Sequence, residues 1–336
     1  MTDDGAPILG IDIGGTKLAF GVVMPDGRVM AEVREPSHAE DGPDAMIDRI
    51  IERAREVVSD SGWSTDHLDA VGIGCGGPLD PWRGVIRNAL NMPGWIDIPL
   101  VTRIESALGR PTFVDNDANA AALGEQRFGV GRGVRNLVYL TISTGVGGGL
   151  ILDDRLYHGE NGNGGELGHI SVRVGGRSCH CGSNGCIETY CSGTSIAARA
   201  RDVLAADPSG PLAERDATEI RAEDVVAAAR DGDPLASSLW AETMELLGGG
   251  VVSIIHAFNP RLVILGGGVT GAGDMLFDPV RRIVAERTMP WLGEVVEVVP
   301  AELGTMTGVL GAVAIALDRL EPMPSLHGSR SRASDV

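Results

Sequence analysis

The sequence predicts an α/β protein with two lobes and a zinc-binding loop. A strand, a glycine turn with threonine and a second strand occur twice, at residues 8–24 and 138–152. Segments with helical and with strand periodicity alternate along the chain, which is typical of α/β proteins. His169 and three cysteines have the spacing of a four-ligand metal site. Two similar halves, each with a glycine turn facing a shared cleft, favour two lobes over one continuous sheet.

The first half opens with a β-meander. Two apolar runs joined by a glycine turn predict two strands, and a second turn follows at Pro25-Asp26-Gly27. A segment with apolar residues on a helical period comes next, and then a buried strand. The expected bounds are Ile8–Ile13 and Leu18–Met24 for the strands of the hairpin, Asp44–Ser59 for the helix and Leu68–Gly74 for the buried strand.

The second half repeats this design. A strand, the glycine turn Thr144–Gly149 and another strand are followed by a long helix, a buried strand that runs into Gly266-Gly267-Gly268, and a last helix. The final residues are rich in Ser, Arg and Pro, a composition typical of disorder. The expected bounds are Val138–Ser143 and Leu150–Leu152 for the hairpin, Ala236–Phe258 for the long helix, Leu262–Leu265 for the strand, Thr305–Leu320 for the last helix and 321–336 for the disordered tail.

Four residues predict a zinc site in the order H-x9-C-x-C-x4-C. They are His169, Cys179, Cys181 and Cys186, and glycine, serine and asparagine form the turn between the last two. Three thiolates and one imidazole complete a tetrahedral shell and leave no open position, so the site is expected to be structural. The alternatives are buried cysteines beside a surface histidine, or a disulfide.

Composition excludes several classes of protein. The chain has 336 residues, five cysteines and a formal net charge of −18. The negative charge argues against nucleic-acid binding. No apolar run reaches the ~20 residues that a membrane span needs, and residues 1–7 are acidic rather than basic and then apolar as in a signal peptide. Four of the five cysteines fall within residues 179–191, so a cytoplasmic protein without a disulfide framework is expected.

Three glycine turns suit phosphate and nucleotide binding. In the first, glycine backbone N–H groups, the Thr16 hydroxyl and the Lys17 charge can contact phosphate, and Asp12 can orient Mg²⁺ or its waters. The second turn, Thr144–Gly149, repeats the glycines and the threonine of the first. The third turn, Gly266-Gly267-Gly268, would allow close backbone approach to adenine and ribose. The structural alternatives are a hairpin with a charged tip and simple helix–strand packing. The spacing of a Walker A loop is absent.

An acidic segment and scattered polar residues predict the sugar side of a transfer site. Asp117 lies at the expected start of an alanine-rich helix, where an ionised carboxylate can accept a hydroxyl proton during phosphoryl transfer. The alternative is that Asp117 only caps the helix. Polar groups in glycine-rich loops could bind a polyol, although such residues are commonly turn formers; they are Gly76, Gly77, Asn88, Asn91 and Glu166.

Five motifs in order resemble the ROK family of sugar kinases and repressors. They are DIGGTK, DNDANAAALGE, STGVGGG, GGELGH and CHCGSNGCIE, and the resemblance covers roughly residues 8–317. It implies an actin-like, hexokinase-type fold of two ribonuclease H-like lobes that transfers phosphate from ATP with Mg²⁺ to a sugar. The implied division is a small lobe of residues 1–116 completed by the helix 305–320, and a large lobe of residues 117–304 that carries the zinc loop.

The resemblance also implies residue roles. Asp117 corresponds to the catalytic base, and one ring nitrogen of His169 ligates zinc while the other reaches a sugar hydroxyl. The implied sugar contacts are Gly77, Asn91, Asn116, Glu166, His169 and Glu188. The implied nucleotide contacts are Asp12, Gly14, Gly15, Thr16, Lys17, Thr144, Gly145 and Gly267. Ser143 and Cys191 depart from the residues that many relatives carry there, but neither removes a ligand or catalytic group.

The sequence favours a hexose kinase acting on glucose at O6. Asn91-Met92-Pro93-Gly94-Trp95 resembles a segment of the family's glucokinases. N-acetylmannosamine or fructose is the alternative substrate. The alternative of a nicotinamide-dependent oxidoreductase depends on two G-x-G-x-x-G matches, which begin at Gly72 and Gly266. The first match runs into prolines rather than a helix, and the second lacks a convincing acidic residue at the end of the next strand.

Two further functions are weighed against the kinase. A catalytically silent sugar sensor would lack the base, which is present here. Family repressors carry a helix-turn-helix before the body, whereas seven residues precede the first expected strand. A homodimer or homotetramer is expected from the resemblance, and whether polyphosphate replaces ATP is left open.

Overall fold

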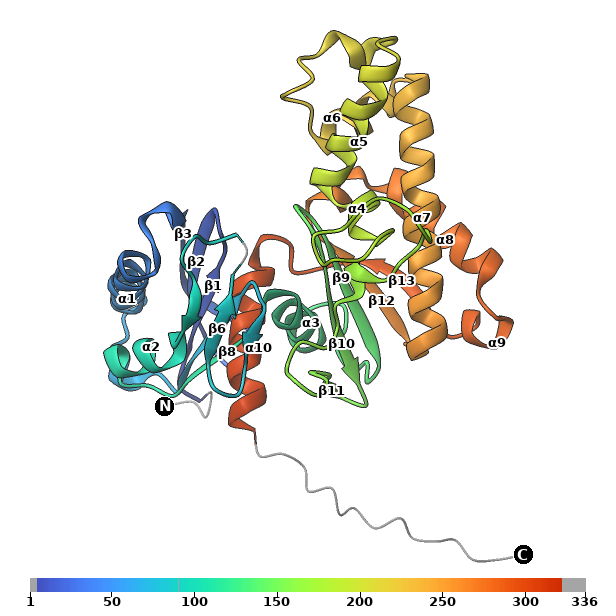
Figure 1. Cartoon of the computed structure of the whole chain (residues 1–336). Coiled ribbons are helices and arrows are strands. Elements are labelled where there is room, and N and C mark those ends of the chain that lie inside the picture. The colour runs from blue at the N-terminus through green and yellow to red at the C-terminus, as the bar shows by residue number, and fades with distance from the viewer. Residues whose placement is uncertain (1–4, 90, 322–336) are drawn as a thin grey trace, which may run out of the picture.

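The computed structural model describes residues 5–89 and 91–321, and Figure 1 shows them in two lobes. Each lobe is built on a five-stranded sheet. In the N-terminal lobe the strands are β1 (Ile8–Ile13), β2 (Lys17–Val23), β3 (Val29–Pro36), β4 (Ala70–Cys75) and β8 (Thr112–Asn116). Helices α1 (Pro43–Asp60) and α2 (Leu100–Leu108) cover its outer face, and a small sheet is formed by β5 (Leu79–Asp80), β6 (Val85–Asn88) and β7 (Ile96–Ile98).

The second lobe has a similar sheet and more helices. Its strands are β9 (Leu137–Ile142), β10 (Val146–Leu152), β11 (Arg155–Leu156), β12 (Leu262–Gly266) and β13 (Glu297–Pro300). Its helices are α4 (Glu188–Cys191), α5 (Gly193–Ala206), α6 (Ala222–Arg230), α7 (Pro234–Phe258), α8 (Asp274–Arg287) and α9 (Pro290–Gly293). No helix among the described residues is long and apolar enough to cross a membrane.

Strand order confirms the duplication that the sequence predicts. The first sheet runs β3-β2-β1-β4-β8 and the second β11-β10-β9-β12-β13. In each, three antiparallel strands form a meander and two parallel strands follow. The two glycine turns therefore occupy equivalent places, at the ends of the first two strands of each sheet.

Helices α3 (Asp117–Phe128) and α10 (Thr307–Leu320) lie between the two sheets (Figure 1). Their alanine-rich faces share one buried cluster with Ile8 and Ala70 of the first sheet and with Leu137 and Ile264 of the second. The last expected helix thus packs on strands from the opposite end of the chain. The lobe boundary after residue 116 stays a prediction, and the expected tail, apart from Glu321, lies outside the described residues.

The expected glycine turn at residues 144–149 is wrong in its extent. Val146–Gly149 belongs to β10 and β9 ends at Ile142, so the turn contains Ser143, Thr144 and Gly145. These strand glycines serve close packing: a Cβ on Gly149 would lie 2.5 Å from the Ala118 carbonyl oxygen of α3. A glycine run after a strand can therefore indicate an approaching helix as well as a loop.

We predict that Gly72→Ala strongly destabilises the protein. A Cβ at Gly72 of β4 would lie 1.8 Å from the Ala312 carbonyl oxygen of α10, so helix and sheet must separate. Overpacking of this kind costs about 1–3 kcal/mol or more. Gly249→Ala in α7 is the matched control, because no atom lies within 4 Å of its Cβ position. It should stabilise by about 0.5–1 kcal/mol. Denaturant unfolding measures both, and equal effects would contradict the prediction.

Candidate active site

The N-terminus of α3 presents Asp117 to the space between the lobes. Asn116 caps this helix, because its side-chain oxygen accepts hydrogen bonds from the N–H groups of Ala118 at 2.9 Å and Asn119 at 3.4 Å. Asp117 is the first helical residue and is exposed. The capping function considered for Asp117 is therefore performed by its neighbour. Asp117 Oδ1 also accepts a hydrogen bond from the Ala118 N–H at 2.9 Å, and the side chain remains exposed.

Asp12 and Asp117 form an acidic pair at this point. Asp12 is on β1, and β4 lies between it and α3. Burial and the nearby charge of Asp117 raise the pKa of Asp12 to about 7. Desolvation by the surrounding protein atoms also raises the pKa of Asp117, whereas hydrogen bonds from backbone N–H groups at the helix N-terminus lower it. Two adjacent carboxylates that resist joint ionisation suit a divalent cation, which would relieve their repulsion.

We predict a pH-dependent stabilisation by Asp12→Asn. The folded-state pKa of about 7 lies above the reference value of 3.8, so folding costs more free energy as pH rises between these values. The gain from Asp12→Asn should therefore grow from pH 4 to pH 7 and then level off. Thermal unfolding across pH with a chelator present measures it. Asp60→Asn, on the exposed end of α1, should show no such trend. A pH-independent gain would contradict the assignment.

The first glycine turn contacts the loop that carries Asn91. Gly14 N–H donates to the Lys17 carbonyl at 3.0 Å, which closes the turn and leaves Thr16 and Lys17 exposed. A Cβ on Gly15 would lie 2.5 Å from the Asn91 carbonyl oxygen. Gly15 is therefore required for the close approach of this loop. The structure brings the expected phosphate and sugar residues together here.

The second glycine turn is held by helix N-termini of the large lobe. Ser143 N–H donates to the Gly145 carbonyl at 2.8 Å. From α5, Gly193 N–H donates to the Ser143 carbonyl and the Thr194 hydroxyl donates to the Thr144 carbonyl, both at 2.7 Å. Hydrogen bonds from the first residues of α5 thus hold the turn, while Thr144 remains exposed.

A cavity of about 560 Å³ adjoins this second turn. Thr144 and Gly268 lie on its wall, next to the positive-φ Gly267, where a Cβ would clash with Ile142. Apolar residues of α5 and α6, the acidic Glu223 and three arginines also line it; the arginines are Arg201, Arg221 and Arg230. The cavity has the size of a small-molecule site. Sequence reasoning found its glycines but missed the arginines, which have no motif.

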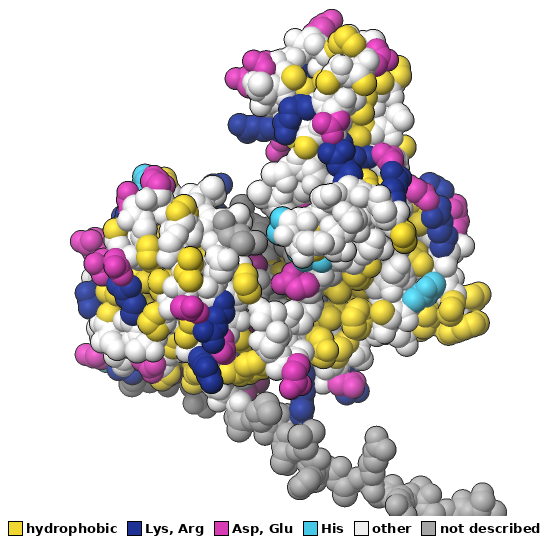
Figure 2. Space-filling view, viewed as in Figure 1, with side chains coloured by type: hydrophobic (Ala, Val, Ile, Leu, Met, Phe, Trp, Pro, Cys, Tyr) yellow, Lys and Arg dark blue, Asp and Glu magenta, His cyan; other side chains and the backbone are white. Residues whose placement is uncertain are grey.

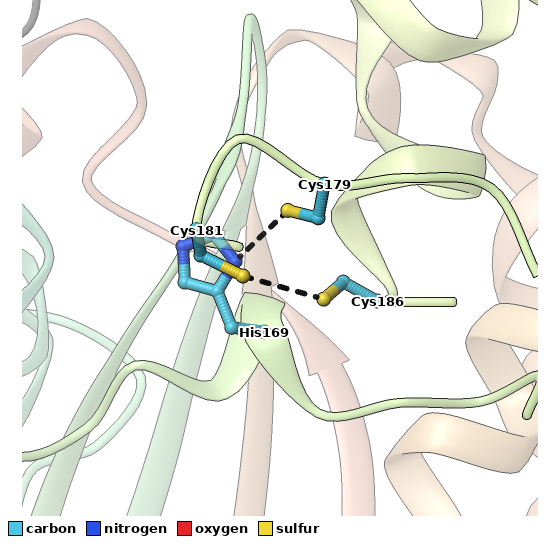
Figure 3. A group of neighbouring side chains, drawn as sticks. All are labelled: His169, Cys179, Cys181 and Cys186. Atoms are coloured by element: carbon cyan, nitrogen blue, oxygen red, sulfur yellow. Dashed lines mark hydrogen bonds between the residues drawn. The ribbon is translucent and has the colours of Figure 1, made fainter. Parts of the chain in front are cut away.

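The four expected zinc ligands converge (Figure 3). Their ligand atoms all lie within 4.8 Å of one another. Cys179 Sγ is 3.5 Å from His169 Nδ1, and Cys181 Sγ is 3.7 Å from Cys186 Sγ. A tetrahedral zinc shell places two sulfurs about 3.8 Å apart and a sulfur and a nitrogen about 3.5 Å apart. The donor set and its spacing therefore fit zinc. Neither a disulfide nor three unrelated cysteines describes this arrangement.

His169 faces two ways. Its Nδ1 is turned to the cysteines, and its Nε2 lies 3.8 Å from Glu166 Oε2. The Glu166 side chain is 58 % exposed, and burial raises the pKa of its carboxyl while His169 opposes the shift. The ring nitrogen that the resemblance assigns to a sugar hydroxyl thus faces an exposed carboxylate at a distance too long for a hydrogen bond.

Glu188 links the zinc loop to the second glycine turn. Its Oε2 accepts a hydrogen bond from Val146 N–H at 2.9 Å, and its Oε1 lies 3.2 Å from His180 Nδ1. A Cβ on Gly145 would lie 2.6 Å from the same carboxylate. The role of Glu188 as a sugar contact stays a prediction, and the structure adds a bracing role that sequence reasoning missed.

Figure 2 shows a groove between the two lobes. A Cβ on Gly77 would lie 3.5 Å from the Asn116 amide nitrogen, so these two residues lie side by side on the N-terminal lobe. Gly72 and Gly74, which suggested a dinucleotide motif, are inside β4 and form no loop. Their role is packing against α10 and α3.

Comparison with known proteins gives the family. The family model described as "ROK family" matches residues 8–319. The chain belongs to the ROK family. A ROK relative named glucokinase, from Thermotoga maritima, is 36 % identical over 315 residues, which cover 93 % of this chain and 98 % of the relative.

Solved structures of ROK proteins have the same fold. A ROK hexokinase from Thermus thermophilus matches with a TM-score of 0.78 and 35 % identity, covering 93 % of this chain and 99 % of that one. A ROK glucokinase from Streptomyces griseus, in complex with glucose and AMPPNP, matches with a TM-score of 0.76 and 34 % identity. The match covers 94 % of this chain and all of that one. The expected hexokinase-type α/β fold is confirmed.

Proposed function

We propose that the protein is an ATP-dependent kinase that phosphorylates glucose at O6. One observation carries this proposal: Asp117, at the N-terminus of α3, lies where both lobes meet. A Cβ on Gly74 would lie 4.0 Å from the Asp117 Cα, and Ala118 packs on Gly147 and Gly149, just behind the second turn. A carboxylate in this place can reach a hydroxyl group bound between the lobes.

The proposed chemistry begins with the proton of the sugar hydroxyl. Asp117 accepts this proton as the hydroxyl oxygen attacks the γ-phosphoryl group, and ADP leaves. Backbone hydrogen bonds at the α3 N-terminus lower the pKa of the Asp117 carboxyl and partly offset the desolvation that raises it. Thr16, Lys17, Thr144 and Gly145 hold the phosphates through backbone N–H groups, hydroxyls and one charge. Mg²⁺, held through Asp12, would offset the charge of the transferred group.

The proposed nucleotide site is the cavity beside Gly267 and Thr144. Its apolar walls suit a base, and its arginines Arg201, Arg221 and Arg230 suit phosphate or ribose oxygens. The relative solved with glucose and AMPPNP supports ATP as the donor. Because Thr144 of the second glycine turn lines the cavity, we place the phosphates of a bound nucleotide at this turn.

The proposed sugar site lies between the N-terminal lobe and a wall of the large lobe that is formed by Glu166 and His169. Zinc would be held by His169 and the three cysteines, and its role is to fix this wall. We assign Asn91, Asn116 and Gly77 to the N-terminal side of this sugar site and Glu188 to its large-lobe side. A relative named glucokinase at 36 % identity favours glucose. N-acetylmannosamine and fructose remain the competing substrates in the test.

A coupled ADP-release assay tests the proposed function. The purified protein is assayed with ATP and Mg²⁺ against glucose, mannose, fructose and N-acetylmannosamine, and the product from glucose is identified by NMR. We expect the highest kcat/KM for glucose and a phosphate on O6. A higher kcat/KM for another sugar would show that this sugar, and not glucose, is the preferred substrate. No ADP release with any sugar would reject the kinase. Inorganic polyphosphate in place of ATP tests the donor, and light scattering tests the expected dimer or tetramer.

A further inference from the structure

A buried carboxylate lies directly before the proposed base. Asp115, at the end of β8, is 1 % exposed. Its Oδ1 accepts hydrogen bonds from the Asn116 N–H and from the Asn119 side-chain amide, both at 2.8 Å. Its Oδ2 lies 2.6 Å from His158 Nε2 and 3.7 Å from the Arg319 guanidinium of α10. Asp115 thus joins β8, α3, α10 and a loop of the other lobe.

The partner His158 begins the loop that leads to Glu166. This loop leaves β11 in the large lobe and crosses to the N-terminal lobe. The His158 ring lies 5.9 Å from the Trp82 ring, and Asn163 Oδ1 accepts a hydrogen bond from Leu79 N–H at 3.3 Å. A Cβ on Gly162 would lie 2.5 Å from Pro81, so this part of the loop lies directly on the N-terminal lobe. Residues 158–165 therefore form a strap between the lobes.

We propose that the Asp115–His158 pair positions the base Asp117 relative to the sugar-binding residue Glu166, an inference that rests on the proposed function. Asp115 fixes the backbone N–H of Asn116, the residue that caps α3, and so sets the direction of the first turn on which Asp117 lies. Through His158 the same carboxylate holds the beginning of the strap. The positions of Asp117 and of the strap that leads to Glu166 therefore both depend on the buried Asp115 carboxylate.

Hydrogen bonding explains why this pair matters. A carboxylate removed from water needs several donors, and each bond to a charged group is worth more than a neutral one. Without the His158 donor, Asp115 Oδ2 keeps only the Arg319 guanidinium at 3.7 Å, which is too long for a good hydrogen bond. The strap would then be held only by Asn163 and packing. A displacement of about 1 Å in a reacting group can cost about 100-fold in rate.

Two His158 variants test the proposal. His158→Leu keeps most of the volume and removes the donor, whereas His158→Gln keeps an N–H group of similar reach. For His158→Leu we expect about a tenfold to 100-fold loss in kcat/KM for glucose, with a higher KM for glucose and an unchanged KM for ATP. His158→Gln should recover most of this loss. His67→Ala, at an exposed histidine of the N-terminal lobe, is the control and should match the parent.

The outcomes separate positioning from mere stability. If His158→Leu lowers the melting temperature but leaves kcat and the glucose KM of the folded protein unchanged, the proposal is overturned. Should His158→Leu not fold, Asn163→Ala removes the second tether of the strap. We then expect a smaller rise in the glucose KM, and an unchanged value overturns the proposal. If the parent releases no ADP with any sugar, the proposed function fails, whereas calorimetric glucose binding by parent and variants still tests the strap.

Discussion

Asp117→Asn is expected to lower kcat for glucose phosphorylation by about 100-fold to 10,000-fold while leaving the glucose Kd within about twofold. General bases contribute rate factors of this size, and the amide cannot accept the hydroxyl proton. The amide keeps nearly the same shape, and Asn116 rather than Asp117 caps the helix, so the α3 N-terminus should remain intact. Steady-state kinetics give kcat, and titration calorimetry gives the Kd.

The same chemical change elsewhere provides the control for this variant. Asp60→Asn, on the exposed end of α1, should leave both kcat and Kd at the parent values. An Asp117→Asn protein that turns over at near the parent rate would remove Asp117 from the mechanism. A variant that loses both turnover and glucose binding would instead indicate that the carboxylate mainly holds the sugar.

Cys181→Ser is expected to lower the zinc content and the glucose affinity together. Cys181 is the exposed member of the ligand set, and serine is a poor zinc ligand. With fewer ligands, His169 loses the bond that fixes its ring, and Glu166 beside it loses a defined position. Changes around a metal site commonly cost about tenfold to 100-fold in affinity. Metal analysis by mass spectrometry and glucose calorimetry measure the two effects.

Cys191→Ser is the matched control for the zinc prediction. Cys191 is a buried cysteine a few residues away, and its thiol lies 3.6 Å from the Thr243 carbonyl rather than in the cluster. Zinc content and glucose affinity should be those of the parent. A Cys181→Ser protein that loses zinc but binds glucose normally would disconnect the metal from the sugar site.

Local pattern predicted the parts of this protein that depend on neighbours in sequence. The sequence predicted the hairpin at β1 and β2, the long helix α7 and the four residues of the candidate zinc site. It could do so because strand, turn and ligand spacing are local. The extent of the second turn was wrong, since Gly147 and Gly149 serve a helix that lies elsewhere in the chain. A glycine that makes room for a distant backbone looks the same in sequence as a glycine in a loop.

Residues that act across the fold gave no signal. His158 is one histidine among seven, and only the structure places it against Asp115, 43 positions earlier. The arginines of the proposed nucleotide cavity, Arg201, Arg221 and Arg230, also lie in none of the motifs. Sequence thus indicated the groups to which we assign chemistry better than the groups that contact them across the fold.

The packing of α10 on β1 and β4 has a consequence for biosynthesis. The ribosome completes the first sheet early, but the helix that covers its inner face follows all the strands and helices of the second lobe in the chain. Until then Ile8, Ala70 and the grooves at Gly10 and Gly72 face water or a chaperone. We therefore expect the nascent N-terminal half to be protease-sensitive during translation, and to become resistant only after α10 has been synthesised and has packed on the first sheet.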